Sequence, residues 1–124
     1  MTVLADSDVL IEVTRGRNQE VLRRWTELST SKDAVLCSVV SVTELWHGAR
    51  PREYELLTNL FSALRCIPVD HGIAWKAGEF LRAFHKSHNL ELADALIAAS
   101  AVSNGAALWT RNEKHYPMSG ISLF

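Results

Sequence analysis

The sequence is poor in cysteine and in long apolar runs, and each shortage excludes a class of protein. The only cysteines are Cys37 and Cys66, which stand in separate short apolar stretches. We therefore expect buried free thiols and not a secreted scaffold held by disulfides. No apolar run approaches the about 20 residues that cross a membrane, and Asp6 comes too early for a signal peptide. These absences predict a cytoplasmic protein without a membrane segment.

Motifs that define several common enzyme classes are also missing. The sequence has no cysteine pair and no His-Glu-x-x-His motif that would indicate zinc, so His85 and His88 are expected to be ordinary surface residues. A glycine-rich phosphate loop and a Gly-x-Ser-x-Gly elbow are absent too. Nucleotide-binding proteins and serine hydrolases therefore lack their defining features here.

Basic residues do not outnumber acidic ones. Thirteen Lys and Arg residues stand against fourteen Asp and Glu residues, for a formal net charge of -1. No positive field of the whole molecule attracts nucleic acid, so such binding must rest on a local group of charges or on a partner. Hydrophobic residues make up 48% of the 124 residues. This is enough for one core, and we expect a single domain over residues 1–124.

Short apolar runs alternate with longer stretches of helical spacing. Strands are predicted at residues 3–5, 34–37, 66–69 and 106–109, each bounded by turn or polar residues. Helices are predicted at residues 9–13, 21–28, 39–49, 54–64, 74–84 and 92–102. Strands separated by long helical segments cannot pair through tight hairpins. We therefore predict an α/β fold with a mainly parallel central sheet flanked by helices on both faces.

Acidic residues stand near the ends of these elements. Asp6 and Asp8 follow the first predicted strand, at the sheet edge where α/β proteins bind ligands. The same residues suit a helix N-cap and first turn, so both interpretations stay open. Asp94 interrupts an apolar stretch, where a carboxylate requires a cation, a pocket or the N–H groups of a first helical turn. Glu44 also stands among apolar residues and either joins a site, pairs with His47 or faces solvent.

A convergence of these carboxylates would have a definite chemical use. Hard divalent ions take oxygen ligands, and Mg²⁺ binds a few carboxylates together with substrate phosphates. An acidic cluster without a cage of cysteine and histidine therefore favours Mg²⁺ or Mn²⁺ over Zn²⁺. The polar loop after the last predicted strand adds candidate ligands (Thr110, Asn112 and His115) and candidate phosphate contacts (Arg111 and Lys114).

Four blocks of sequence carry a resemblance to a known family. They are Val3–Ile11, Ser41–Ala49, Leu92–Ala101 and Leu108–Tyr116, and in this order they span nearly the whole chain. With these blocks the chain resembles the PIN-domain family, specifically the VapC-type toxins of bacterial and archaeal toxin–antitoxin pairs. The resemblance implies a PIN-like three-layer sandwich and a metal-dependent endoribonuclease that hydrolyses RNA phosphodiester bonds.

The resemblance also implies roles for particular residues. Asp6, Glu44 and Asp94 would be catalytic and would hold one or two Mg²⁺ or Mn²⁺ ions. Asn112 would be a fourth catalytic residue, at the position where many relatives carry another acid. Further residues are expected to support these ligands from around the site, namely Ser7, Asp8, Glu91 and Thr110.

The partners implied by the resemblance are RNA, an antitoxin and a second copy of the chain. Arg111 and Lys114 are expected to contact RNA phosphates, with Arg15 and Arg17 as further candidates. A cognate VapB-like antitoxin would dock in an apolar groove and place a basic side chain among the acids, inhibiting the enzyme. A homodimer is the oligomer expected of the family.

Two other functions stay open on the sequence alone. Asp6-Ser7-Asp8 after an apolar strand also resembles the start of a haloacid-dehalogenase-type phosphatase, in which the first Asp is the nucleophile. No later lysine motif or terminal acid pair supports that interpretation. Asn112, standing in place of an acid, is consistent with a PIN fold that has lost catalysis and acts only as a binding or regulatory module.

Overall fold

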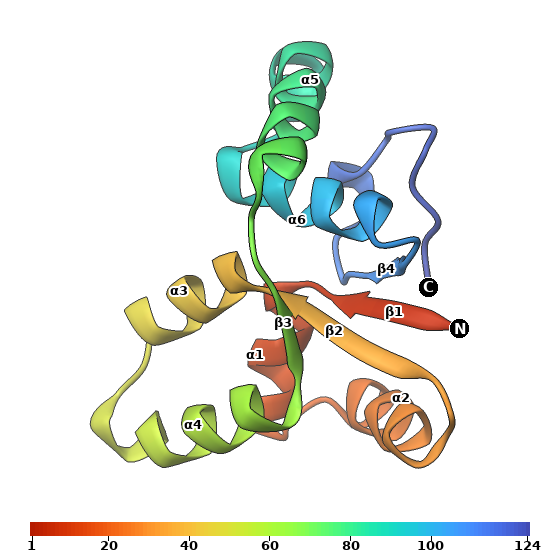
Figure 1. The fold of residues 1–124 in the computed structure, drawn as a ribbon. Helices are drawn as coiled ribbons and strands as arrows, with labels where there is room; N and C mark the ends of the chain where they lie inside the picture. The colour runs from red at the N-terminus through yellow and green to blue at the C-terminus, as the bar shows by residue number, and fades with distance from the viewer.

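A computed structural model describes all of residues 1–124 (Figure 1). Its strands are β1 (Thr2–Ala5), β2 (Ala34–Ser38), β3 (Arg65–Ile67) and β4 (Ala107–Trp109). Its α-helices are α1 (Ser7–Arg15), α2 (Gln19–Thr30), α3 (Val39–His47), α4 (Tyr54–Ala63), α5 (His71–His88) and α6 (Leu92–Ser103). Two short 3₁₀ helices are η1 (Pro51–Glu53) and η2 (Glu113–His115).

The four strands form one parallel sheet in the order β3-β2-β1-β4. Leu4 of the central strand β1 stands opposite Leu36 of β2 and Leu108 of β4. All three leucines are buried, as expected of a parallel sheet that is covered on both faces. The predicted mainly parallel central sheet is confirmed.

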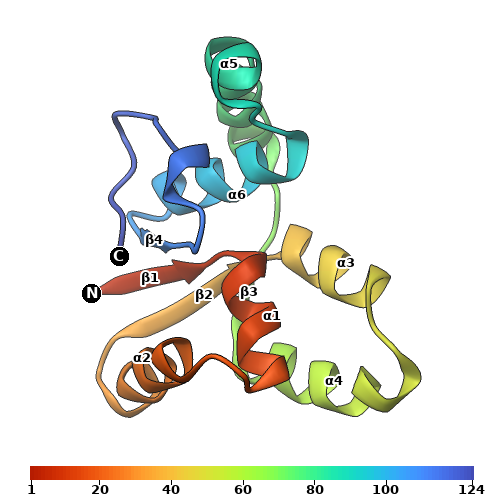
Figure 2. The ribbon, with the colours of Figure 1, turned by 180° about the vertical axis from the view of Figure 1, so that it is seen from behind.

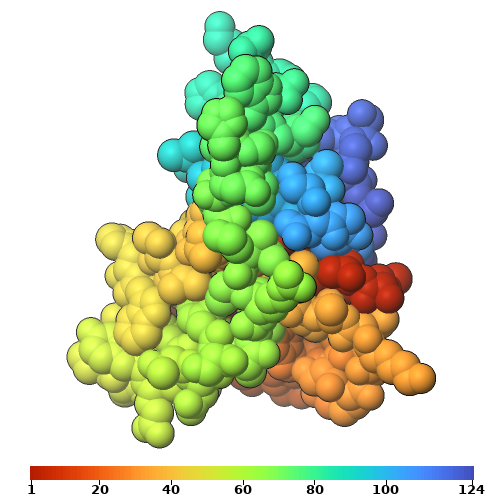
Figure 3. Space-filling view, in the orientation of Figure 1, coloured from red at the N-terminus to blue at the C-terminus, as the bar shows by residue number.

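Helices cover both faces of the sheet and complete a three-layer sandwich. In both ribbon views α5 and α6 lie on one side of the sheet, and α1, α2 and α4 lie on the other (Figures 1 and 2). A hydrophobic core lies on each face of the sheet, and successive side chains of β1 point to opposite faces. Leu4 packs with α5 and α6 in one core, while Val3 and Ala5 pack with α1 and α2 in the other. The end of α5 projects beyond the other elements in the space-filling view (Figure 3).

The clearest difference from the predicted helices is at α5. This helix begins at His71 and not at residue 74, because the Asp70 carboxylate accepts a hydrogen bond from the backbone N–H of Ile73 at 2.8 Å. It also runs past the predicted end at residue 84 and stops before Asn89, which has a left-handed backbone with φ of 52°. No helix combines the length and the apolar character needed to cross a membrane.

The edge strand β3 is shorter than predicted and carries one of the two cysteines. It ends at Ile67 because Pro68 has no N–H to donate to a neighbouring strand. Cys66 stands opposite Cys37 of β2, and their sulfur atoms are 3.2 Å apart. Both are free thiols, as predicted, although only Cys37 is buried. Burial raises the pKa of the Cys37 thiol, which therefore stays neutral.

Candidate acidic site at the carboxyl edge of the sheet

Asp6 is the buried centre of the acidic site. It follows β1 and caps α1, and its side chain is only 6% exposed by residue area. One carboxylate oxygen, Oδ1, accepts the backbone N–H of Ser7 at 2.7 Å, while Oδ2 accepts the hydroxyls of Thr110 and Tyr116, each at 2.8 Å. The Asp6 backbone N–H donates to the carbonyl of Trp109 at 2.9 Å, which ties the ends of β1 and β4 together. Three donors thus hold this carboxylate in one orientation.

Tyr116 joins Asp6 to Asp94. Its hydroxyl lies 3.4 Å from Oδ1 of Asp94 while it donates to Asp6. Asp94 sits in the first turn of α6, where its Oδ2 accepts the backbone N–H of Glu91 at 3.3 Å. Asp94 is therefore a residue of the first helical turn, as one interpretation left open by the sequence has it, and it also approaches Asp6 through the Tyr116 hydroxyl. Tyr116 closes one of the four sequence blocks, but its position at the site was not predicted.

Glu44 reaches the site through serine hydroxyls. The hydroxyl of Ser7 donates to Glu44 Oε1 at 2.7 Å and lies 2.7 Å from the hydroxyl of Ser41. Because Ser7 has one proton and directs it to the carboxylate, Ser41 is the donor in the serine pair. Figure 2 shows that α1 and α3, which carry these residues, begin beside each other (Figure 2). Ser41 is a second site residue that the sequence analysis missed.

Asp8 lies beside Asp6, and only one of its two carboxylate oxygens accepts a hydrogen bond. Its Oδ2 accepts the backbone N–H of Arg111 at 3.1 Å, but its Oδ1 is buried without any hydrogen-bond partner. Burial, together with the charge of Asp6, raises the pKa of Asp8 to about 6. The Thr110 hydroxyl lies between the two acids, 3.4 Å from Asp8, and accepts the backbone N–H of Asn112 at 3.1 Å.

The other predicted site residues are less engaged. Asn112 contacts the site through its backbone N–H, which donates to the Thr110 hydroxyl, and its exposed side chain forms no capping hydrogen bond. Glu91 is the N-cap of α6 and contacts Asp94 in a capping box, in which the Asp94 carboxylate accepts the Glu91 backbone N–H. Arg111 pairs with Glu12 at 3.1 Å, whereas Lys114 is exposed and forms no ion pair. The structure therefore gathers Asp6, Asp8, Asp94 and Thr110, brings in Glu44 through Ser7, and leaves the side chains of Asn112, Glu91 and Lys114 at the margin.

The site holds more negative charge than its surroundings balance. Burial raises the pKa of Asp6, and the nearby charge of Asp94 acts in the same direction against the hydrogen bonds from Tyr116 and Thr110. Burial and the surrounding carboxylates also raise the pKa of Tyr116, which keeps its proton as a donor. Two basic groups act on the site: the Nδ1 atom of His115 lies 3.7 Å from Asp94, and the charge of Arg111 acts to lower the pKa of Asp8. A positively charged ligand would relieve this repulsion.

The donor set fits a hard divalent cation. Apart from the His115 ring, the site presents carboxylates, hydroxyls and backbone groups, and Mg²⁺ and Mn²⁺ prefer oxygen ligands. Oδ1 of Asp8, which has no hydrogen-bond partner, is a free acceptor. No three Asp, Glu, His or Cys side chains already surround one point in a ligating arrangement. The acidic side chains are held apart by hydroxyl groups. The Tyr116 hydroxyl lies between Asp6 and Asp94, and the Ser7 hydroxyl donates to Glu44.

Comparison with known proteins identifies the class to which this fold and site belong. Residues 3–120 match the family described as PIN domain. The chain belongs to the PIN domain family, and its PIN-like sandwich is thereby confirmed. Family membership also leaves the haloacid-dehalogenase interpretation without support.

Named relatives narrow the comparison to VapC proteins. The chain is 41% identical over 118 residues to ribonuclease VapC10 of Mycobacterium tuberculosis, covering 94% of this chain and 86% of that protein. A toxin–antitoxin complex from Klebsiella pneumoniae contains a chain with 25% identity and a TM-score of 0.72, covering 96% of this chain and 94% of that one. A chain of VapBC2 from Rickettsia felis, crystallised with a promoter DNA fragment, shares the fold at 20% identity and a TM-score of 0.81, covering 100% and 98%.

Proposed function

We propose that this protein is a metal-dependent endoribonuclease toxin that hydrolyses RNA phosphodiester bonds and is inhibited by a cognate antitoxin. The observation that carries the proposal is the meeting of Asp6 and Asp94 at one tyrosine hydroxyl on the carboxyl edge of the sheet. Similarity to a protein named ribonuclease VapC10 supports the reaction class. The oxygen donors of the site support Mg²⁺ or Mn²⁺ as the cofactor.

Asp6, Glu44 and Asp94 would hold the ion. When bound, a divalent ion activates water for in-line attack and neutralises charge on the leaving oxygen. The protein contributes orientation, because the hydroxyls of Thr110 and Tyr116 hold Asp6 and the hydroxyl of Ser7 holds Glu44. Products with a 5′-phosphate and a 3′-hydroxyl follow from attack of water on the phosphorus.

A VapB-like antitoxin is the proposed regulator. The fold is shared with chains of VapBC complexes, which supports a protein partner of this kind. A basic side chain of the antitoxin placed beside Asp6 and Asp94 would satisfy their excess negative charge and compete with the metal. A homodimer and a cytoplasmic location remain predictions, to be tested by light scattering and by cell fractionation.

The activity is tested with total cellular RNA and antitoxin-free protein. The parent chain, Asp94→Asn and the control Glu79→Gln are each incubated with Mg²⁺, Mn²⁺ or EDTA, and new 5′-phosphate ends are sequenced. Glu79 is an exposed acid on α5 beside Lys76. We expect metal-dependent cuts from the parent and from Glu79→Gln, and none from Asp94→Asn.

Two results would contradict the proposal. Cuts that persist in Asp94→Asn would remove the acidic site from the reaction. An absence of cuts from folded parent protein in every metal would favour the non-catalytic binding module, for which Asn112 is the sequence feature.

A further inference from the structure

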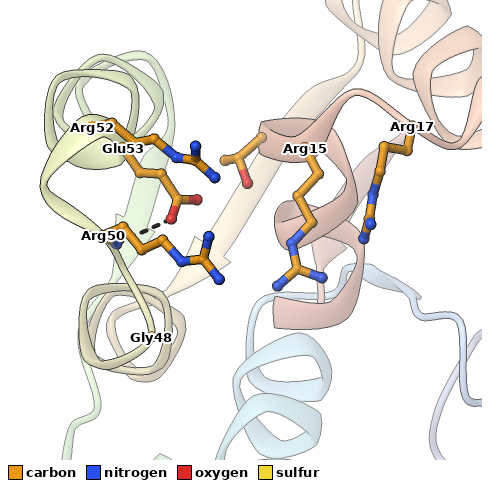
Figure 4. A pocket seen from close by; sticks show the side chains of 7 residues that line it. Arg15, Arg17, Gly48, Arg50, Arg52 and Glu53 are labelled. Carbon is orange, nitrogen blue, oxygen red and sulfur yellow. Dashed lines mark hydrogen bonds between the residues drawn. The ribbon is translucent and has the colours of Figure 1, made fainter.

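Four arginines line a polar cleft away from the acidic site. Arg15 and Arg17 come from the end of α1 and the turn after it, and Arg50 and Arg52 come from the connection between α3 and α4. The cleft has a volume of about 610 Å³ and no hydrophobic residue in its lining. Figure 4 shows Arg15 on one side and Arg50 and Arg52 on the other, with their guanidinium groups directed into the space between (Figure 4).

These arginines lack acidic partners. None of the four lies within salt-bridge distance of a carboxylate. Arg23 and Arg111 elsewhere on the surface are paired, and Arg65 and Arg82 are unpaired but do not share a cleft with other arginines of this group. Glu53 is the one acid in the lining, and its Oε1 accepts the backbone N–H of Arg50 at 3.0 Å. Four guanidinium groups thus stand against one carboxylate, in a chain whose formal net charge is -1.

A purely structural role explains only part of the cluster. Arg15 lies in the last turn of α1, where a cation stabilises the carbonyl end of a helix. The other three arginines are exposed and lie outside the α-helices, with Arg17 after α1 and with Arg50 and Arg52 between α3 and α4. Holding like charges around a common space costs free energy unless an anion binds there.

The position of the cleft relates it to the acidic site. Helices α1 and α3 pack against each other and run from the acidic site to the cleft, with Ser7 at the start of α1 and with Glu44 one turn before Gly48 of the cleft lining. From Ser7 to Arg15 the axis of α1 rises by about 12 Å. That distance corresponds to a few nucleotides, because a stacked strand advances about 3.4 Å per nucleotide.

We propose that this arginine cleft binds backbone phosphates of the RNA substrate a few nucleotides from the bond cleaved at the acidic site. The proposal rests on the proposed ribonuclease function. Guanidinium groups bind phosphates through two parallel hydrogen bonds, and a polar lining suits a backbone and not an apolar peptide segment. Because the acids repel RNA, a separate group of positive charges supplies the attraction that the whole molecule lacks.

The test separates RNA binding from cleavage. Binding of mixed-sequence single-stranded RNA to the full chain is measured in EDTA over a range of salt concentrations, for the parent and for Arg50→Gln/Arg52→Gln. The control is Arg65→Gln/Arg82→Gln, which removes the same charge from two exposed arginines that form no salt bridge and do not line the cleft. Circular dichroism checks that each variant is folded.

We expect the cleft variant to bind about tenfold more weakly or worse than the control, as for the loss of charged hydrogen bonds. The slope of log K against log salt should become less steep by about 1.4, because each lost phosphate contact on a single strand accounts for about 0.7. Cleavage of long RNA in Mg²⁺ should lose apparent affinity with little change in kcat.

Equal affinity and equal slope in the cleft variant and the control would overturn the proposal. A second arm measures binding of a glutamate-rich peptide. If the cleft variant loses the peptide but keeps RNA, the cleft serves an acidic protein partner and the proposal is wrong. If RNA binding depends on the cleft but the parent cleaves no RNA, the proposed ribonuclease function fails while the cleft assignment stands.

Discussion

The hydroxyl of Tyr116 donates to Oδ2 of Asp6 across 2.8 Å, joining two residues that are 110 positions apart in the chain. The same hydroxyl lies 3.4 Å from Asp94. One phenol therefore sets the separation of the two acids that are proposed to bind the metal. Because the pKa of Tyr116 is raised by burial and by these carboxylates, the phenol remains a donor throughout the physiological pH range.

Tyr116→Phe should impair cleavage and shift its pH dependence. Loss of the hydroxyl removes a hydrogen bond that lowers the pKa of Asp6, so the acid limb of the rate profile should move to higher pH. Activity at neutral pH should fall by about tenfold or more. The control is Tyr54→Phe, at an exposed tyrosine on α4. An unshifted profile in a folded Tyr116→Phe protein would show that the phenol does not act through Asp6.

Ser7→Ala should weaken the response to metal. Without its hydroxyl, Glu44 loses the donor that holds it at 2.7 Å, and removing such a supporting contact typically costs about 10–100-fold in metal affinity or activity. A titration of cleavage rate against Mg²⁺ measures this effect. Ser29→Ala, which removes a hydroxyl bonded only to a backbone carbonyl on α2, serves as the control. The same Mg²⁺ midpoint in both variants would exclude a role for Ser7 in holding Glu44.

Asp8→Asn should stabilise the metal-free protein at neutral pH. The folded pKa of Asp8, about 6, is above its ordinary value of 3.8. The protonated carboxyl therefore contributes stability below about pH 4, and this contribution is lost as the pH rises through about 6. In EDTA the variant and the parent should unfold at similar temperatures at pH 4, and the variant should unfold a few degrees higher at pH 7.

The control is Asp33→Asn, whose stability relative to the parent should change with pH in the opposite direction. The N-terminal amine lies 2.9 Å from Asp33 and lowers the pKa of its carboxyl. Asp33→Asn should therefore lose stability relative to the parent as the pH rises from acid to neutral. If the unfolding temperature of Asp8→Asn relative to the parent also falls as the pH rises, a group other than those described stabilises the Asp8 carboxylate.

Lys114 and Arg111 should contribute unequally to RNA binding. Lys114 is exposed and free of ion pairs, whereas the guanidinium of Arg111 is held by Glu12. Lys114→Gln should make the salt dependence of RNA binding less steep by about 0.7, while Arg111→Gln should change it less. An equal change in both variants would mean that Arg111 leaves Glu12 to contact phosphate.

Much of the site was predictable because its acids occupy positions with a local meaning. Asp6 directly follows an apolar strand, and Asp94 interrupts an apolar helix, so each is conspicuous in its own stretch of sequence. Tyr116 and Ser41 carry no such signal. An aromatic residue in a polar loop and a serine on an apolar helix usually have structural roles, and only their contacts distinguish them.

Local patterns sufficed for the parallel sheet, the alternation of strands and helices, and the placing of acids at one edge, because periodicity and strand ends depend on neighbours in the chain. Docking of distant segments decided the rest. The position of Tyr116 directly after η2 puts its hydroxyl between Asp6 at the end of β1 and Asp94 in α6. Packing of α1 beside α3 brings two pairs of arginines, each an ordinary surface pair in sequence, to one cleft. Such groups meet only when burial of the apolar helix faces has fixed the distances between segments that the chain itself leaves free.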